Sequence, residues 1–228
     1  MNIFLTGHTN GLGRGLLEHA LEMGHKLWCL SRSSSQKTHP NLNESLCDLS
    51  TTSFDQLNEL LINVPPIDLV ILNAGVLGEI KDLSQFSDSE LKKVFEVNFF
   101  SQKLLLDVLL TRDVHRVLGI STGAILKSQK GWGPYSMSKN AFKSLLEFYA
   151  LEFPRTHFLS LAPGIIKTNM QEKILNVDTE NYQSFKRLQE ANLSGQMPTP
   201  NQSAALIFDH LETYFQTESG GYTDVRNY

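Results

Sequence analysis

The sequence predicts an α/β fold, one doubly wound sheet of about seven parallel strands with helices on both faces. Three observations predict it. Seven short apolar segments lack the alternation typical of half-exposed strands, as expected for strands buried on both faces. The stretches between them are long enough for crossover helices, and the first segment runs into a glycine-rich turn. The predicted strands are Ile3–Thr6, Lys26–Leu30, Ser45–Leu49, Leu69–Leu72, Val117–Ile120, Phe158–Leu161 and Tyr222–Val225.

Length and composition predict a single domain over residues 1–228, with 41% hydrophobic and 19% charged residues. The net charge of −4 favours neither nucleic acid nor an anionic membrane as a partner. No apolar run is long enough to span a bilayer. The first residues are predicted to form a strand and not an export signal. Cys29 and Cys47 are expected to be buried thiols and not a disulfide, so the expected compartment is the cytoplasm.

Three helix starts can be predicted. Ser87 and Glu90 form a capping box, and Thr199 forms another before a helix that extends to about Leu211. A third helix begins near Tyr135 and ends before Pro154. The least regular stretch, residues 164–198, is expected to be a substrate lid or insert. In the helix that begins at Ser87, one face contains Leu91, Val94, Phe95, Asn98, Gln102, Leu105 and Leu109.

The turn after the first strand has the features of a phosphate-binding site. Its sequence is Thr6-Gly7-His8-Thr9-Asn10-Gly11-Leu12-Gly13, and it opens a predicted helix. The glycines allow a tight turn and a close approach of the backbone to a pyrophosphate, while the helix N-terminus supplies free N–H groups. The alternative is a tight strand-to-helix turn that binds no ligand.

The end of the second strand indicates which dinucleotide is bound. An NAD enzyme places a carboxylate there to bind the ribose 2′-hydroxyl. This chain has Ser31 followed by Arg32 instead, and no acidic residue between Arg32 and Glu44. An arginine can bind a 2′-phosphate with two charge-assisted hydrogen bonds. The sequence therefore favours NADP(H), with NAD(H) as the alternative should Arg32 be only a solvated surface residue.

The spacing T-G-x-x-x-G-x-G resembles that of the short-chain dehydrogenase/reductase family, in its short single-domain branch, and further motifs follow in the family's order. They are Asp48-Leu49, Asn73-Ala74-Gly75, Tyr135-Ser136-Met137-Ser138-Lys139 and Pro163-Gly164-Ile165-Ile166-Lys167-Thr168. The resemblance implies a Rossmann-type domain. It also implies that Asp48 and Leu49 hold the adenine, that the Asn73 motif supports the adenosine side, and that the Pro163 motif holds the nicotinamide carboxamide.

Tyr135 and Lys139 carry the expected chemistry. Four residues apart on a helix, they lie on one face as neighbours. Lowering the pKa of a tyrosine from about 10 to near 7 requires roughly 4 kcal/mol of preferential stabilisation of the phenolate. A lysine cation and the oxidised nicotinamide can supply much of it, so Tyr135 would exchange a proton with a carbonyl or alcohol oxygen. The alternative is a tyrosine and a lysine on an ordinary amphipathic helix.

The resemblance implies two further catalytic residues. The family has a serine 13 residues before the tyrosine, where this chain has Thr122, with Ser121 beside it. Thr122 is favoured as the hydroxyl that polarises the substrate carbonyl, and Ser121 is the substitute. Asn98 is expected to shape its helix around a water that links Lys139 to solvent. Alternatively, Asn98 is a structural amide that bonds neighbouring backbone.

The sequence therefore predicts an NADP(H)-dependent oxidoreductase that interconverts a carbonyl and a secondary alcohol, with a small-molecule substrate. An alternative function, without catalysis, is that of a dinucleotide-binding redox sensor or scaffold. Trp132 and Met170 could line the substrate pocket or belong to the core. No histidine pair has metal-ligand spacing, so no metal site is expected. Family resemblance implies a homodimer or homotetramer.

Overall fold

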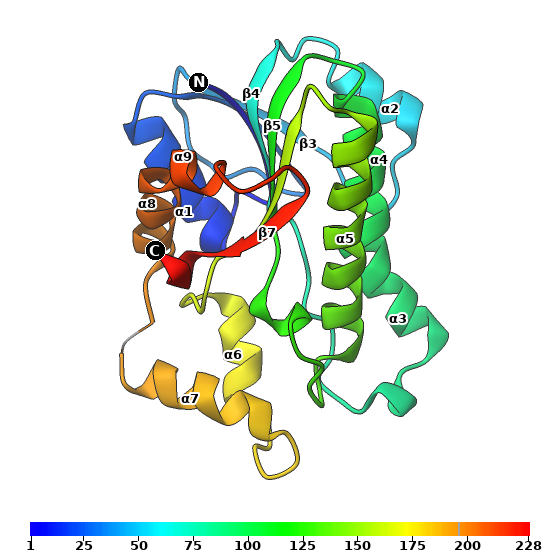
Figure 1. Cartoon of the computed structure of the whole chain (residues 1–228), viewed down its shortest axis with the longest axis vertical. Coiled ribbons are helices and arrows are strands. Elements are labelled where there is room, and N and C mark those ends of the chain that lie inside the picture. Colours follow the sequence, from blue (N-terminus) through cyan, green and yellow to red (C-terminus); the bar gives the residue numbers. More distant parts are fainter. Residues whose placement is uncertain (196) are drawn as a thin grey trace.

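The computed structural model describes residues 1–195 and 197–228 and has the predicted three-layer architecture (Figure 1). Its sheet has seven strands in the order β3-β2-β1-β4-β5-β6-β7, and every neighbouring pair is parallel. The strands are β1 (Asn2–Thr6), β2 (Lys26–Ser31), β3 (Leu42–Leu46), β4 (Ile67–Leu72), β5 (Val114–Ile120), β6 (His157–Ala162) and β7 (Gly221–Asp224). Since β1 lies mid-sheet, the chain winds outward in both directions, as predicted.

Helices cover both faces of the sheet (Figure 1). One layer holds α1 (Gly11–Glu22), α8 (Pro200–Asp209) and α9 (Leu211–Tyr214), and the other holds α2 (Phe54–Leu60), α4 (Ser101–Leu109) and α5 (Gly133–Glu152). The remaining α-helices of the described residues are α3 (Asp88–Phe95), α6 (Asn169–Leu175) and α7 (Lys186–Leu193).

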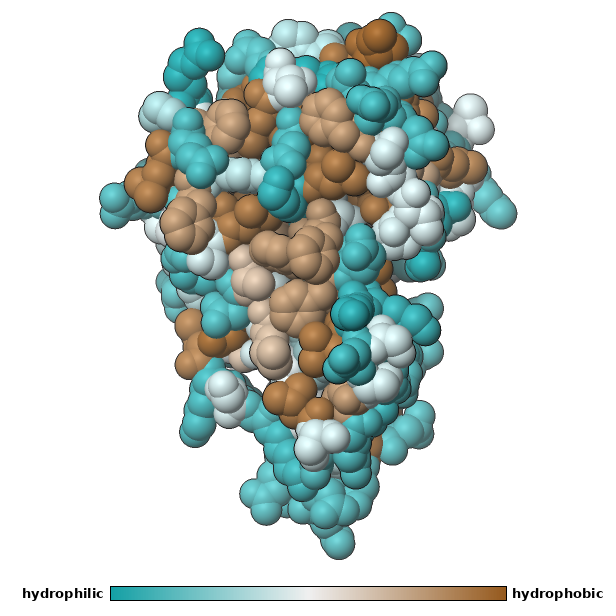
Figure 2. All heavy atoms as spheres, turned by 90° about the vertical axis from the view of Figure 1, so that its right-hand side faces the viewer, coloured by the Kyte–Doolittle hydropathy of each residue, from teal (hydrophilic) through white to brown (hydrophobic). Residues whose placement is uncertain are grey.

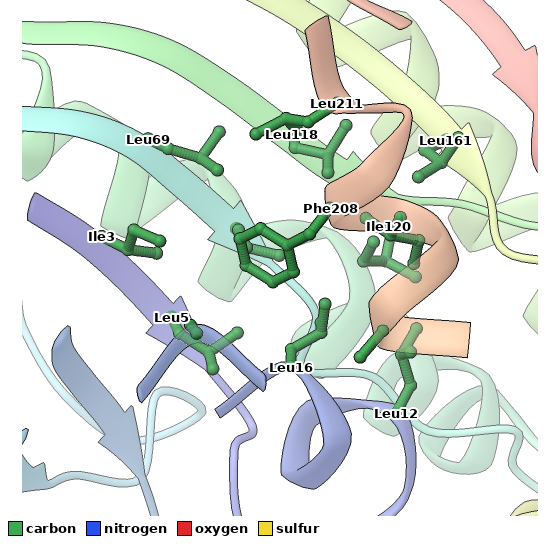
Figure 3. Packing of buried hydrophobic residues seen from close by; sticks show 14 of the residues in the cluster. Ile3, Leu5, Leu12, Leu16, Leu69, Leu118, Ile120, Leu161, Phe208 and Leu211 are labelled. Carbon is green, nitrogen blue, oxygen red and sulfur yellow. The ribbon is translucent and has the colours of Figure 1, made fainter. Parts of the chain in front are cut away.

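Each central strand contributes alternate side chains to two separate cores. Ile3 and Leu5 of β1 belong to the core under α1 and α8, whereas Phe4 belongs to the core under α4 and α5. Figure 3 shows the first core, in which Phe208 of α8 lies among side chains of β1, β4, β5 and α1. Burial on both faces explains why the strand sequences lack alternation.

The predicted limits of the third strand were wrong. The prediction was Ser45–Leu49, but β3 occupies Leu42–Leu46. This strand lies at the sheet edge, where its residues are half-buried or exposed, so hydrophobicity does not define its limits. Its register is set by parallel pairing with β2, from Leu27 opposite Leu42 to Ser31 opposite Leu46. Cys47 and Asp48 therefore follow the strand and do not belong to it.

The predicted helix starts are confirmed. Ser87 and Thr199 both form complete capping boxes, at α3 and α8. The helix of Tyr135 begins two residues earlier than that residue, at Gly133, and ends at Glu152. The helix predicted to reach Leu211 ends at Asp209, and α9 follows after His210. Residues 164–198 contain α6 and α7, which lie together at one end of the sheet (Figure 1).

A π-helical turn, Glu96–Phe100, separates α3 from α4 and was not predicted. The hydroxyl of Ser101 and the amide of Gln102 both donate hydrogen bonds to the carbonyl of Val97. Such turns insert one residue into a helix and are frequent at functional sites. Here the turn contains Asn98, which is fully buried.

Candidate active site

A cavity of about 820 Å³ lies where the carboxyl ends of β1, β2, β4, β5 and β6 meet. This edge of a doubly wound sheet is where ligands bind in such folds. Every site residue predicted from the sequence lines the cavity except Asn98. The turn after β1 and the ends of β2 and β3 form one end of it, and Thr122, Tyr135 and Trp132 belong to the other.

The glycine turn is tightly built. Gly7 and Gly11 have φ values of +67° and +53°, in the left-handed region that favours glycine. A Cβ on Gly13 would lie 2.0 Å from the carbonyl oxygen of Gly7, so no larger residue fits without a backbone shift. Asn10 precedes α1 without capping it through its side chain, which leaves the first N–H groups of the helix available to an anion.

Asn73, the residue that follows β4, supports this turn. Its Nδ2 donates hydrogen bonds to the carbonyls of Thr6 and Gly7, at 3.1 Å each. The backbone N–H groups of Asn73 and Ala74 both donate to the hydroxyl of Thr6, at 3.0 Å. The side-chain amide expected to support the adenosine thus holds the end of β1 against the end of β4.

Arg32 and Asp48 lie at the opposite end of the cavity from Tyr135. The Arg32 side chain is exposed and lines the cavity, and it makes no hydrogen bond or ion pair within the described residues. Asp48 accepts hydrogen bonds from the backbone and hydroxyl of Ser50, which lower the pKa of its carboxyl group, with a smaller contribution from the Arg32 charge. The arginine is therefore free to meet a ligand in the cavity.

Tyr135 and Lys139 lie on successive turns of α5, and both are buried. The ammonium of Lys139 donates a hydrogen bond to the carbonyl of Ile120, at 2.7 Å. Burial lowers the pKa of Lys139 to about 8. The pKa of Tyr135 is raised by burial, although a hydrogen bond with Thr122 opposes this. The expected lowering of this pKa therefore does not occur without bound cofactor, and the phenol carries its proton at neutral pH.

Two hydroxyl groups follow β5. Thr122 accepts a hydrogen bond from the backbone N–H of Ala124, and its side chain opposes the rise in the pKa of Tyr135. The hydroxyl of Ser121 is buried and has no hydrogen-bond partner within the described residues. Of these two hydroxyl groups, that of Thr122 is the one that influences the pKa of Tyr135.

Asn98 lies behind the cavity and makes three hydrogen bonds. Its Oδ1 accepts from the N–H of Val76 at 2.8 Å, and its Nδ2 donates to the carbonyl of Val76 and the hydroxyl of Ser138. A Cβ on Gly75 would lie 3.2 Å from Asn98 Oδ1 and 3.3 Å from Lys139 Nζ. The amide therefore bonds neighbouring backbone, as the structural alternative expects, and also lies beside the lysine.

Trp132 and Met170 line the cavity and also pack in a small hydrophobic cluster with Tyr135. The Trp132 ring stacks on Phe185, with centroids 4.6 Å apart, and its Nε1 donates to the hydroxyl of Ser184 at 3.1 Å. These contacts hold residues 182–185 of the insert against the start of α5. Trp132 and Met170 thus line the cavity and also belong to a hydrophobic cluster, so the two alternatives expected from the sequence both apply.

Sequence reasoning missed several residues of the cavity wall. Arg187 comes from α7 and Arg226 follows β7, where it forms an ion pair with Asp224. No local motif marks either arginine, because both reach the cavity only through the tertiary fold. Other lining residues not singled out include Ser33, Val76, Gln129, Ile174, Gln183 and Leu188.

Residues 1–195 and 197–228 contain neither a candidate metal site nor a candidate membrane span. No group of three histidine, cysteine or acidic side chains there is arranged to hold a metal ion. None of the helices in that part of the chain combines the length and hydropathy that crossing a bilayer requires.

The fold and the cavity define a Rossmann-type protein suited to an elongated dinucleotide. Residues 1–178 match the short chain dehydrogenase family model. A benzil reductase ((S)-benzoin forming) of Bacillus subtilis strain 168 is 27% identical over 98% of both chains. The sepiapterin reductase of Rattus norvegicus is 31% identical, over 96% of this chain and 94% of its own. A short chain dehydrogenase from Shigella flexneri 2a, crystallised with NADP, has a TM-score of 0.79 at 20% identity, covering 99% of this chain and 96% of its own.

This chain belongs to the short-chain dehydrogenase/reductase family, whose members are oxidoreductases that bind a nicotinamide dinucleotide.

Proposed function

We propose that the protein is an NADP(H)-dependent oxidoreductase that interconverts a carbonyl and a secondary alcohol, with Tyr135 as general acid and base. One observation carries the proposal: a single cavity has Arg32 and the glycine turn at one end and Thr122, Tyr135 and Lys139 at the other. The first set suits a phosphorylated dinucleotide, and the second suits proton transfer at a carbonyl oxygen.

The residues present fit the cofactor. The close approach of Gly13 to the Gly7 carbonyl leaves a turn that a pyrophosphate can meet at its backbone. Arg32 would hold the 2′-phosphate, since the position that selects NAD carries no carboxylate. Asp48 and Leu49 would contact the adenine, and the Pro163–Thr168 segment would hold the carboxamide. Bound NADPH would supply the hydride.

Tyr135 would donate its phenolic proton to the carbonyl oxygen during reduction. Because burial keeps the phenol protonated, the side chain is ready for this direction. Lys139 would stabilise the resulting phenolate from the next turn of α5, and the Thr122 hydroxyl would orient and polarise the carbonyl. Asn98 would hold Lys139 in place and connect it to solvent. In the reverse direction Tyr135 would accept the proton of the alcohol.

The substrate class we propose is a carbonyl compound with a flat, largely apolar body. The substrate end of the cavity presents Trp132, Met170, Ile174 and Leu188 to a ligand. The similarity to a benzil reductase and a sepiapterin reductase supports the same class. Benzil, an aromatic diketone, and sepiapterin are therefore the first substrates to assay, and residues 164–198 would form the lid over them.

We further propose that the chain assembles as a homodimer or homotetramer through the face of α4 and α5. Figure 2 shows a band of hydrophobic and weakly polar residues down the middle of the side that carries these helices. Phe148 and Leu151 of α5 are 61% and 80% exposed, an unusual exposure for large apolar side chains unless a partner covers them. Both cysteines are free thiols, which supports the cytoplasm as the compartment.

Titration of the purified protein with NADPH and NADH, followed by nucleotide fluorescence, tests the cofactor assignment. We expect NADPH to bind at least about tenfold more tightly and the difference to be lost in Arg32→Ala. Equal affinities would contradict the assignment of Arg32, and binding of neither would favour a scaffold.

Turnover tests the chemistry. With benzil or another confirmed substrate, Tyr135→Phe is expected to lower kcat by at least about a hundredfold while leaving NADPH affinity within about threefold. Undiminished turnover by this variant would refute the catalytic role of Tyr135.

A further inference from the structure

A hydrogen bond between His8 and Glu44 lies directly behind the glycine turn. His8, inside the turn, is 0% exposed, and its Nε2 lies 2.5 Å from Oε1 of Glu44 on β3. Neither side chain lines the cavity, although the flanking residues Gly7 and Thr9 do. The two side chains therefore support the wall of the cofactor site from behind, and we do not expect them to contact a bound ligand.

The same carboxylate also holds the segment that follows β2, residues 31–37. Oε1 of Glu44 accepts a hydrogen bond from the backbone N–H of Ser35 at 2.8 Å, and Oε2 accepts one from the hydroxyl of Ser34 at 3.0 Å. On the other side, Arg14 of α1 donates to the carbonyl of Ser35 at 2.9 Å. This segment carries Arg32 and Ser33 into the cavity wall.

Glu44 is ionised, because its hydrogen bonds lower the pKa of the carboxyl group to about 2 against the opposing effect of burial. Both carboxylate oxygens accept hydrogen bonds from the protein. The first acidic residue after the 2′ position is thus occupied as an acceptor and is not offered to a ribose hydroxyl.

We propose that Glu44 is a positioning residue for cofactor selection: by joining the glycine turn to residues 31–37, it holds Arg32 where a 2′-phosphate would bind. The inference rests on the NADP preference proposed above and adds a residue that does not contact the cofactor. Without the carboxylate, residues 31–37 would lose the hydrogen bonds of Ser34 and Ser35 and keep the one from Arg14. Binding of a 2′-phosphate would then require ordering of a loose segment, whereas a 2′-hydroxyl does not need Arg32.

The test compares affinities of wild type, Glu44→Ala, Glu44→Gln and Ser34→Ala for NADPH and NADH. For Glu44→Ala we expect NADPH to bind about tenfold or more weakly and NADH to change by less than about threefold. Glu44→Gln keeps one acceptor oxygen and should recover part of the selectivity. Ser34→Ala removes the hydroxyl that donates to Glu44 and accepts from the N–H of Gln36, at an exposed position. This variant should fold normally and shift selectivity in the same direction by about threefold.

Glu90→Ala is the matched control. Glu90 is another carboxylate whose pKa is lowered to about 2 by hydrogen bonds, but these come from Lys81 and from the capping box of α3. The Glu90→Ala variant should be less stable than wild type but should have the same ratio of NADPH to NADH affinity. Equal loss of both cofactors in Glu44→Ala and an unchanged ratio in Ser34→Ala would overturn the inference. A wild-type protein without NADPH preference would instead refute the proposed cofactor, whatever the variants do.

Discussion

Lys139 holds an ammonium group in the interior without a carboxylate partner among the described residues. Its only hydrogen bond there is to the carbonyl of Ile120, and its ammonium also lies 5.5 Å from the centre of the Phe142 ring. Burying a cation in this way costs stability, and a protein tolerates the cost where function needs the charge. Lys139→Met, which keeps the length of the side chain and removes the charge, should therefore stabilise the fold while abolishing turnover.

The expected stabilisation of the Lys139→Met variant can be calculated from the lowered pKa of Lys139. Burial reduces the pKa of Lys139 from its ordinary 10.5 to about 8, so at pH 7 the charged form is disfavoured in the folded state by about 3 kcal/mol. Loss of the bond to Ile120 and of the contact with Phe142 offsets about 1 kcal/mol. We expect a net gain of roughly 2 kcal/mol, which is about 5 °C in Tm for a protein of this size.

The sign of the pH dependence distinguishes this cause from general repacking. Between pH 8 and 10.5 the unfolded chain keeps the proton of Lys139 while the folded protein has lost it, so wild-type stability rises with pH. The methionine variant lacks this contribution. Its advantage should be full below pH 8 and nearly absent by about pH 9.5.

Urea unfolding of the cofactor-free proteins at pH 7 and pH 9.5, followed by circular dichroism, measures both effects. Lys143→Met is the control, because Lys143 is on the next turn of α5 and pairs with Glu147 near the surface. That variant should change stability by less than about 0.5 kcal/mol at either pH. A less stable Lys139→Met variant, or an advantage that does not shrink as the pH rises, would refute the reasoning.

Two further predictions concern the glycine turn and the assembly. Gly13→Ala places a Cβ 2.0 Å from a backbone oxygen, so NADPH affinity in fluorescence titration should fall by at least about tenfold; Gly24→Ala, where nothing lies within 4 Å, should leave it unchanged. Light scattering should show an oligomer for wild type and a monomer for the double variant Phe148→Glu with Leu151→Glu, because two charges cannot be buried unpaired in an interface. Leu193→Glu, at an 83% exposed position on α7, should remain oligomeric, and a wild-type monomer would contradict the proposed assembly.

Much of the site was predictable because its signals are local. The capping boxes at Ser87 and Thr199 depend on residues three positions apart, and the placement of Tyr135 with Lys139 on one helix face depends on residues four apart. The turn at Gly7 follows a strand whose apolar residues already indicate burial. Parallel strands then bring such motifs to one edge of the sheet, so nearly all predicted residues line one cavity.

By itself, then, the sequence determined the fold class, the glycine turn and the tyrosine–lysine helix, because backbone conformation and helical periodicity are properties of neighbouring residues. The tertiary structure alone decided the register of β3, the π-helical turn at Asn98, the bond between His8 and Glu44, and the stacking of Trp132 on Phe185. An edge strand takes its register from its partner, and contacts between residues 36 or more positions apart depend on how layers pack. No local pattern in the chain encodes that packing.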